Sequence, residues 1–343
     1  LEFEKTEYGR DFLTVKTSFS ELLLCDGTGL VFCYFHFVCD DNTSFYTKSL
    51  NNVDFELTRE KESATPFRIL FYDKNFDVPE FPKSSVMYHI FVDRFNKGTF
   101  ECNERKDIVK IEDWLGGEIE FPEYAGAPMK NNTFFGGNLY GIIDKLDYLK
   151  ELGISVLYLS PIFKAYSNHK YDTGDYENVD EMFGGNKALS ELITKAHEKG
   201  MKIILDGVFN HTGDDSKYFN KYASYSSLGA FQSKDSPYYH WFSFEEHPEK
   251  YSCWWGIKIL PKLRTDTQEI REFFTGENGI VRKWLREGID GWRLDVADEL
   301  PDEFLDSLRT ATKDENNQSL IIGEVWENAA DKISYGKRRK YFS

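Results

Sequence analysis

Three acidic residues each follow an apolar run that is typical of a buried strand. Asp206 comes after Ile-Ile-Leu, Asp295 after Trp-Arg-Leu, and Glu324 after Ile-Ile-Gly. If these strands are neighbours in one parallel sheet, their carboxyl groups meet at one mouth, where burial and like charge separate their pKa values. Such carboxyl groups can serve as a nucleophile and as a general acid and base. An isolated strand-end carboxylate would be read as solvated, but three in register favour a shared site.

Two basic side chains accompany these carboxylates in the sequence. Arg293 stands two residues before Asp295, so both side chains should point to the same face of the strand. A guanidinium in that place would keep Asp295 ionised, as a nucleophile requires, although a structural buried ion pair is the alternative. His211 follows Asp206 closely and could donate a hydrogen bond to a substrate hydroxyl, whereas a lone histidine is often structural.

Apolar strands that alternate with amphipathic helices would position these residues. The pattern predicts an α/β fold of the (β/α)8 TIM-barrel type, of which only about the first five βα units are present. Active sites of this fold form at the carboxyl ends of the strands. The predicted strands are Val86–Val92, Ser155–Leu159, Lys202–Val208, Gly291–Val296 and Leu320–Glu324. The predicted helical stretches lie near Asn138–Leu152, Ala188–Lys199, Thr267–Glu287 and Pro301–Thr312.

The chain divides into two predicted domains. Residues 1–80 carry short alternating or apolar runs between polar turns, which predicts a small all-β sandwich. Pro79 and Pro82 favour extended backbone and mark the boundary, so residues 81–343 form the partial catalytic barrel. Within the barrel, an insertion at about 212–266 is dense in Tyr, Phe and Trp and is too long for a plain βα loop, which indicates a functional role.

The charge and cysteine content restrict the partners and the compartment. A net charge of -16 and a pI near 5.0 disfavour nucleic acid and anionic lipid, and no apolar run is long enough to span a membrane. The odd number of cysteines, without C-x-x-C spacing, indicates free thiols in a reducing compartment, so we expect a cytoplasmic protein. Because the chain begins at Leu1 instead of Met, a removed leader and secretion stay open.

The segments around the carboxylates identify a family by resemblance. They read Asp-Gly-Val-Phe-Asn-His at 206–211, Gly-Trp-Arg-Leu-Asp at 291–295 and Gly-Glu-Val-Trp at 323–326. In this order and on successive strands, they resemble the first three signature regions of the α-amylase family of glycoside hydrolases. Asn-His-Lys-Tyr-Asp-Thr at 168–173 resembles the βα loop that supplies a sugar-stacking tyrosine in that family.

Two further features resemble one branch of this family. Leu-Pro-Lys-Leu at 260–263 is similar to a short motif of the neopullulanase, cyclomaltodextrinase and maltogenic amylase branch. The β-rich N-terminal region resembles the extra domain of that branch, which often forms dimers. The resemblance therefore implies an α-glucan oligosaccharide substrate and a homodimer through the N-terminal domain.

The resemblance implies retaining cleavage of α-1,4-glucosidic bonds in maltodextrins, cyclodextrins or pullulan by double displacement. Asp295 would be the nucleophile, and Glu324 would be the proton donor and then the base. Asp206 would belong structurally to the same network, and Trp326 would line the leaving-group side. The implied substrate contacts are Tyr171 as the stacking platform, His169, His211, Arg293, Asp206 and Trp326.

The sequence departs from the family pattern in two places. The family uses a further Asp, preceded by Asn-His, on a later strand, and no such segment occurs before Ser343. Five strands cannot close an eight-stranded barrel, so we expect a piece of a longer enzyme whose own activity is open. Some members bind calcium near the first βα loop, where Asn96 and Asn138 match part of a site. Hard cations prefer charged oxygens, so we expect these two asparagines to cap turns instead of binding calcium, and we expect no cofactor.

Three other functions stay open on the sequence alone. The same mouth could hold glucan without chemistry, in a non-catalytic α-glucan-binding fragment. A metal-dependent barrel hydrolase would use His169, Asp206 and His211, although no H-x-H pair supports it. A transglycosylase or α-glucosidase of the same family differs only in the acceptor or the substrate length.

Overall fold

The computed structural model describes residues 2–7, 10–14, 29–71, 78–100, 105–124, 127, 129–327, 329, 333–334 and 337–338. Contacts group the chain into two units, residues 1–77 with 328–343 and residues 78–327. The predicted domain ranges, with a boundary at residue 80, stay a prediction.

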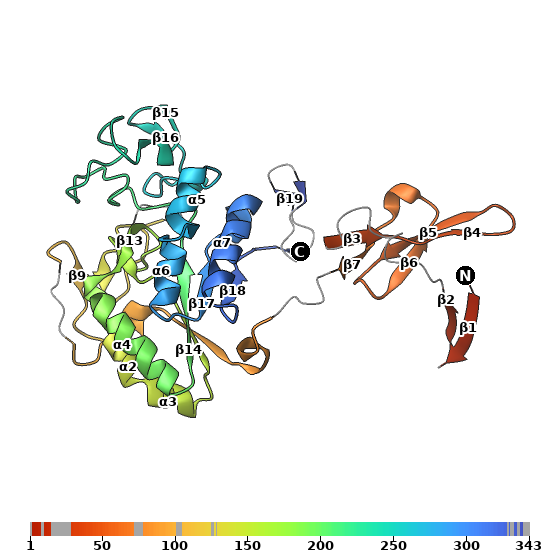
Figure 1. Ribbon diagram of the computed structural model, residues 1–343, viewed down its shortest axis with the longest axis horizontal. Coiled ribbons are helices and arrows are strands. Elements are labelled where there is room, and N and C mark those ends of the chain that lie inside the picture. Colours follow the sequence, from red (N-terminus) through yellow and green to blue (C-terminus); the bar gives the residue numbers. More distant parts are fainter. Residues whose placement is uncertain are drawn as a thin grey trace. The chain divides into compact units, whose positions relative to one another are not determined.

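A five-stranded parallel sheet forms the centre of the larger unit (Figure 1). Its strands follow one another in chain order from one edge to the other, as successive strands of a barrel do. The strands are β8 (Met87–Ile90), β11 (Val156–Leu159), β14 (Lys202–Gly207), β17 (Gly291–Leu294) and β18 (Leu320–Gly323). All five predicted strands are therefore present, and the predicted partial (β/α) barrel is confirmed.

The register of the sheet brings the strand ends together. Asp206 of β14 pairs with Arg293 of β17, and Leu294 pairs with Gly323 of β18. Asp295 and Glu324 are the residues that follow these last two positions, so they leave the sheet at the same edge. The carboxyl edge of the sheet thus collects all three predicted carboxylates.

Helices alternate with these strands along the chain. They are α2 (Leu139–Asp144), α3 (Leu146–Glu151), α4 (Gly185–Glu198), α5 (Gln268–Thr275), α6 (Ile280–Arg286) and α7 (Asp302–Glu315). α2 packs against α4, and α5, α6 and α7 pack against one another (Figure 1). Short 3-10 turns cover Lys61–Ser63, Phe81–Ser84, Val92–Arg94, Glu181–Phe183, Tyr239–Trp241, Trp254–Gly256 and Ala297–Glu299.

Two predicted helical stretches each contain two helices in the structure. The stretch Thr267–Glu287 divides into α5 and α6 because Gly276 leaves the helix with an extended backbone (φ -62°, ψ 177°), and a Cβ there would lie 2.5 Å from the Glu272 carbonyl oxygen. Gly279 is equally crowded, with the Phe274 oxygen 2.7 Å from its Cβ position. The stretch Asn138–Leu152 divides at Lys145, where the backbone tightens and the Lys145 N–H donates to Ile142.

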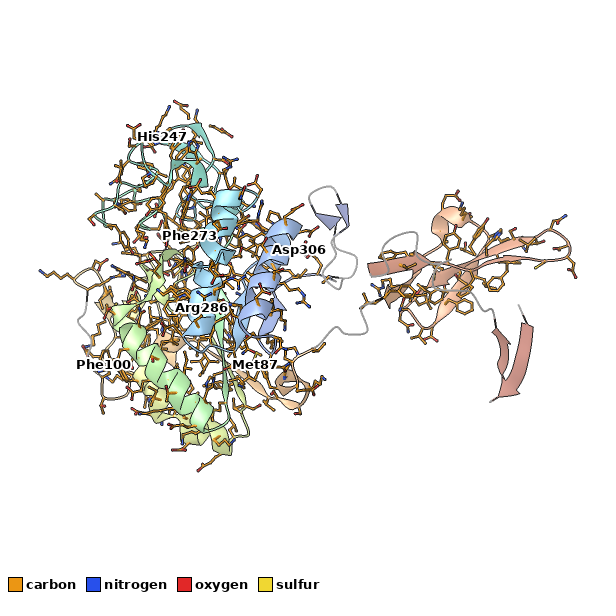
Figure 2. The ribbon with its side chains drawn as sticks, viewed as in Figure 1. Met87, Phe100, His247, Phe273, Arg286 and Asp306 are labelled. Atoms are coloured by element: carbon orange, nitrogen blue, oxygen red, sulfur yellow. The ribbon has the colours of Figure 1, made fainter. Side chains whose placement is uncertain are left out.

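Aromatic rings fill much of the core between the sheet and α5 to α7. Tyr176 and Phe274 are fully buried with ring centroids 4.9 Å apart, and Phe209 contacts Trp292 at 5.5 Å. Phe273, labelled in Figure 2, lies 4.7 Å from Trp241 of the insertion. Part of the high aromatic content therefore serves packing, and the insertion shares this core.

The insertion after β14 contains its own small elements. Strands β15 (Phe244–Glu246) and β16 (Lys250–Tyr251) form a hairpin. Backbone bridges pair the residues that flank this hairpin with a later segment of the insertion, Phe242 with Leu263 and Cys253 with Pro261. Before β14, β12 (Phe163–Ala165) pairs antiparallel with β13 (Thr173–Val179), and β9 (Val109–Lys110) pairs parallel with β10 (Thr133–Phe134).

The smaller unit contains antiparallel strands, as predicted for the N-terminal region. Phe67 of β7 makes edge contacts with Phe35 and Phe55, which join the β3–β7 pair to the β4–β5–β6 sheet. Cys33 and Cys39 are free thiols here, and Cys253 is free in the larger unit, while Cys25 and Cys102 lie outside the described residues. The strands are β1 (Glu2–Glu7), β2 (Arg10–Thr14), β3 (Gly29–Cys33), β4 (His36–Val38), β5 (Ser44–Ser49), β6 (Phe55–Thr58), β7 (Phe67–Phe71), β19 (Ile333–Ser334) and β20 (Lys337–Arg338).

Candidate active site

Arg293 joins the three predicted carboxylates. Its Nη1 lies 2.9 Å from Asp206 Oδ2 and 3.0 Å from Asp295 Oδ1, and its Nη2 lies 2.8 Å from Glu324 Oε1. Three acidic groups from neighbouring strands therefore share one half-buried guanidinium. This shared cation allows the carboxylates to approach one another in a site that excludes most water.

Tyrosine hydroxyls complete the surroundings of Asp206. The Tyr158 and Tyr171 hydroxyls donate to Asp206 Oδ2 at 2.5 Å and 3.2 Å. With Arg293 on the same carboxylate, Asp206 is fully engaged by the protein, so its arrangement suits support of the neighbouring groups. The ring of His89 stacks on Tyr158 at 4.4 Å and extends the network to β8.

Burial raises the pKa of both aspartates in this network. The pKa of Asp295 rises to about 7. Burial is the main cause and the negative charge of Asp206 is the second, while the positive charge of Arg293 opposes them only in part. Burial raises the pKa of Asp206 to about 6, against the opposing effects of Arg293 and Tyr158. Arg293 thus offsets only part of the effect of burial and of Asp206 on the Asp295 carboxyl group.

A strained backbone position connects Asp295 to Glu324. Val296 has φ 40° and ψ 52°, a left-handed conformation that a β-branched residue rarely adopts. Its N–H donates to Glu324 Oε2 at 2.9 Å. The Glu324 side chain is thus held at both oxygens, by Val296 and by Arg293.

His211 lies at the start of the insertion, with its ring buried. Its ring stacks on Trp254 at 5.5 Å, and its Nε2 has no hydrogen-bond partner in the protein. Burial lowers its pKa to about 4, with a smaller opposing effect from the Tyr171 carbonyl. His211 is therefore neutral near pH 7. The backbone of the Leu260–Leu263 segment pairs with residues 210–211. Lys262 and His211 form an antiparallel backbone bridge, and the Leu263 N–H donates to the Asn210 carbonyl.

His169 and Tyr171 lie side by side on the loop between β12 and β13. Their ring centroids are 5.9 Å apart, and the Tyr171 N–H donates to His169 Nδ1 at 3.1 Å. The Tyr171 hydroxyl reaches Asp206, as described above, so the loop places the Tyr171 ring beside this carboxylate and His169 next to Tyr171. Burial lowers the pKa of His169 and raises that of Tyr171.

An aromatic surface continues from Glu324 to the insertion. The Trp326 ring is 62% exposed and lies 5.4 Å from the Trp255 ring, which is 68% exposed. The indole N–H groups of Trp254 and Trp255 both donate to Glu299 Oε1, at 3.1 Å and 2.7 Å. Large exposed rings of this kind can stack on sugar faces.

The calcium candidates Asn96 and Asn138 engage the backbone at the start of α2. Asn138 Oδ1, the atom that a calcium ion would require, accepts the Gly141 N–H at 2.9 Å, and Asn96 donates to the Gly141 carbonyl. No group of three or more His, Cys, Asp or Glu side chains in the described part of the chain could hold a metal ion. The expectation that the chain uses no cofactor stays a prediction. Among the described residues, no helix is long and apolar enough to cross a membrane.

Sequence reasoning did not anticipate Tyr158 or Glu299. Tyr158 lies within the apolar strand Val-Leu-Tyr-Leu, and a phenol with a polar tip in such a run is the signal that could have pointed to it. Glu299 contacts Trp254 and Trp255 from a distant part of the chain, so no local pattern could reveal its role.

Several known proteins are similar to this chain. The family model described as alpha amylase, catalytic domain, matches residues 89–341. The chain is 41% identical over 314 residues to an amylopullulanase of Thermoanaerobacterium saccharolyticum, covering 81% of this chain and 23% of that protein. It is 35% identical over 285 residues to neopullulanase 2 of Thermoactinomyces vulgaris, covering 80% of this chain and 44% of that protein.

Solved structures show the same similarity. A cyclomaltodextrinase superposes with a TM-score of 0.62 at 29% identity, covering 88% of this chain and 48% of that one. A cyclic α-maltosyl-(1→6)-maltose hydrolase from Arthrobacter globiformis superposes with a TM-score of 0.60 at 32% identity, covering 73% and 53%. The chain spans less than half of the two curated relatives above. From the family match over residues 89–341, we conclude that the chain belongs to the α-amylase family of glycoside hydrolases.

Proposed function

We propose that this chain supplies the nucleophile and the acid/base of a retaining glycosidase that cleaves α-1,4-glucosidic bonds. The observation that carries the proposal is the contact of one guanidinium with both Asp295 and Glu324, at 3.0 Å and 2.8 Å. Carboxyl groups held this close suit double displacement, for which a separation of roughly 5–5.5 Å is typical.

The proposed reaction has two steps. Glu324 protonates the glycosidic oxygen while Asp295 attacks the anomeric carbon, so the leaving sugar departs as an alcohol and a covalent glycosyl-enzyme forms. Glu324, now ionised, removes a proton from water, which displaces Asp295 and restores the starting protonation states. Tyr171 and His169 flank the sugar, and the Nε2 atom of His211 is free to bond a hydroxyl.

The substrate class is an α-glucan oligosaccharide, on the analogy of the relatives. Those relatives are named amylopullulanase, neopullulanase, cyclomaltodextrinase and maltogenic amylase, names that point to pullulan, cyclodextrins and maltodextrins. Trp326 and Trp255 lie beyond Glu324 and suit contacts with the leaving group. Transfer to a sugar acceptor in place of water uses the same residues, and it remains the alternative outcome.

Proton NMR of the anomeric signals tests the proposal. β-Cyclodextrin and maltoheptaose would be incubated with the polypeptide and with Asp295→Asn. Release of α-anomeric ends by the parent alone supports the mechanism, and β-anomeric ends would contradict it. Broadened sugar signals without cleavage would favour the non-catalytic α-glucan-binding alternative.

The proposal extends to assembly and compartment. A homodimer through the N-terminal unit and a cytoplasmic location are proposed by analogy with the family branch. Sedimentation of the polypeptide with and without residues 1–77 tests the first, since only the longer form should be dimeric.

A further inference from the structure

Lys170 is a fully buried lysine in the loop that carries His169 and Tyr171. Its side chain is 0% exposed, and its Nζ lies 2.6 Å from Asp180 Oδ2, whose side chain is 5% exposed. Phe134 and Phe183 cover the ammonium group at 5.4 Å and 4.8 Å. Burial of an ammonium group costs several kcal/mol unless it is paired, so the loop depends on this contact.

Two backbone N–H groups also bind the Asp180 carboxylate that pairs with Lys170. Its Oδ1 accepts the Met182 N–H at 2.9 Å, and its Oδ2 accepts the Ala165 N–H at 3.3 Å. Burial alone would raise the pKa of Asp180, but the Lys170 charge and these donors outweigh it, and the pKa falls below its usual value. An ionised carboxylate is therefore fixed under the loop.

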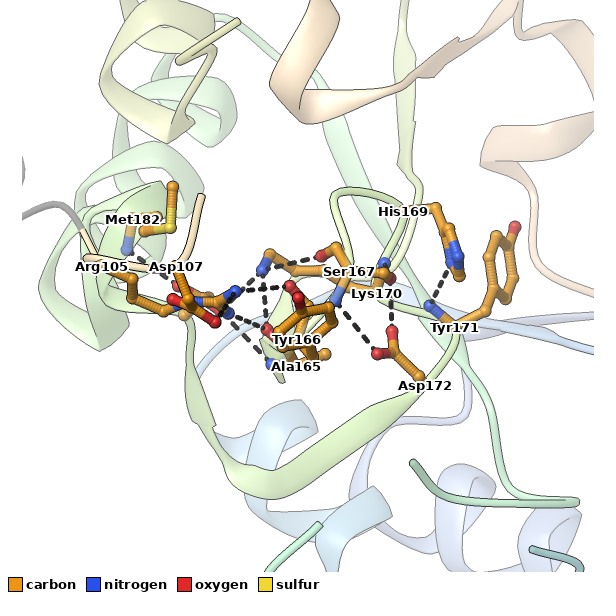
Figure 3. A network of polar contacts seen from close by, with 11 residues as sticks. Arg105, Asp107, Ala165, Tyr166, Ser167, His169, Lys170, Tyr171, Asp172 and Met182 are labelled. Carbon is orange, nitrogen blue, oxygen red and sulfur yellow. Dashed lines mark hydrogen bonds and ion pairs between the residues drawn. The ribbon is translucent and has the colours of Figure 1, made fainter. Parts of the chain in front are cut away.

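The backbone of Lys170 adopts an unfavourable conformation. Its φ is 60°, in the left-handed region, which costs about 1–2 kcal/mol for a residue with a Cβ. This conformation turns the chain at Lys170. Figure 3 shows the rings of His169 and Tyr171 on the opposite side of the loop from Arg105.

Both cations converge on the same short turn. The Ala165 carbonyl accepts Arg105 Nη1 at 2.9 Å and Lys170 Nζ at 3.3 Å (Figure 3). Arg105 also donates to the Tyr166 carbonyl at 2.8 Å, and Lys170 donates to the Ser167 carbonyl at 3.4 Å. The carbonyl groups of residues 165–167 thus accept hydrogen bonds from Arg105 or Lys170, which leaves the loop little freedom to shift.

We propose that Lys170 is a positioning residue: its buried ion pair with Asp180 sets the placement of Tyr171 against Asp206. The link is short, since Tyr171 follows Lys170 directly and its hydroxyl lies 3.2 Å from Asp206 Oδ2. A displacement of about 1 Å at a reacting site can lower the rate about 10²-fold. This inference rests on the proposed function only in treating Tyr171 as a substrate contact.

The test follows the Tyr171 ring in the polypeptide labelled with 13Cζ-tyrosine. Its resonance is assigned by its loss in Tyr171→Phe. In Lys170→Met, the Tyr171 signal should shift, and its pKa should fall toward the ordinary value of about 10, because the hydroxyl leaves its buried place beside Asp206. An unchanged signal and an unchanged titration in a folded Lys170→Met protein would overturn the proposal.

A matched control separates positioning from general destabilisation. Arg282→Met breaks a partly buried ion pair with Glu315 and a more exposed one with Asp314, both on α7. It should lower the thermal stability but leave the Tyr171 signal in place, and a comparable shift there would count against the proposal. If Lys170→Met does not fold, Asp180→Asn decides, with a smaller shift in the same direction expected and no shift contradicting.

The outcome is independent of catalysis. A shifted Tyr171 signal in Lys170→Met, together with a parent chain that neither cleaves nor binds maltoheptaose, would keep the positioning role and reject the proposed function. An unshifted signal together with α-anomeric product would do the reverse.

Discussion

Two aspartates at opposite ends of strand β17 have nearly equal burial but different surroundings. Asp290, before the strand, is 6% exposed and accepts hydrogen bonds from His197, Lys202 and the Ile203 N–H at 2.7–2.9 Å. Asp295, after the strand, is 7% exposed and shares Arg293 with two other carboxylates. At the amino end of the sheet, the negative charge of Asp290 is matched by hydrogen-bond donors. At the carboxyl end, three carboxylates share one guanidinium, so negative charge is in excess. This division agrees with the general assignment of stability to the amino end and chemistry to the carboxyl end of such barrels.

The largest effect should come from Glu324 at the carboxyl end. Glu324→Gln should lower turnover about 10²–10⁴-fold, because the proton transfer is lost, while maltoheptaose binding is retained. Steady-state kinetics and calorimetric titration measure the two quantities, and Glu277→Gln on the exposed surface serves as the control. Unchanged turnover in Glu324→Gln would remove Glu324 from the mechanism.

At the amino end, a substitution should affect stability instead. Asp290→Ala should lower the free energy of unfolding by about 1–3 kcal/mol, because the Ile203 N–H and the two side-chain donors lose their acceptor. Urea denaturation measures the change. A stability equal to that of the parent would show that the two ends do not differ in this way.

The opposite sign is expected at Asp295. Its folded pKa of about 7 exceeds the ordinary value, so its contribution to stability is present at low pH and is lost as the pH rises from about 4 through 7. Asn does not titrate, so Asp295→Asn should be more stable than the parent at pH 8, by about 1–3 kcal/mol. The difference should shrink toward pH 4. Urea denaturation at both pH values checks this, and a destabilised variant at pH 8 would contradict the assigned charge crowding.

A smaller effect should appear in the titration of Asp295 itself. Asp206→Asn removes a neighbouring negative charge and leaves Asp295 as the carboxylate that Arg293 Nη1 contacts. Both changes favour the ionised form of Asp295, so its pKa should fall by about 1 unit. Carbon NMR of the labelled aspartate carboxyl groups follows the titration. A rise in pKa would mean that the Arg293 contacts depend on Asp206.

The sequence predicted the strands and the carboxylates because these follow simple periodicity. Apolar runs that end in an acidic residue define where Asp206, Asp295 and Glu324 leave a parallel sheet. The helix break at Gly276 and Gly279 was missed because the flanking apolar spacing continues through it. Lys170 gave no signal of burial, since a charged loop residue normally lies in solvent, and only its distant partner Asp180 makes the burial tolerable.

The proposed function requires Asp295 to form a covalent bond to the sugar during cleavage. A 5-fluoro-α-maltosyl fluoride, which forms the glycosyl-enzyme faster than water releases it, would be incubated with the polypeptide, followed by proteolysis and mass spectrometry of the peptides. We expect one added sugar on the peptide that contains Asp295, and no added sugar in Asp295→Asn. Labelling of Glu324 or Asp206 instead, or continued release of fluoride without any adduct, would contradict it.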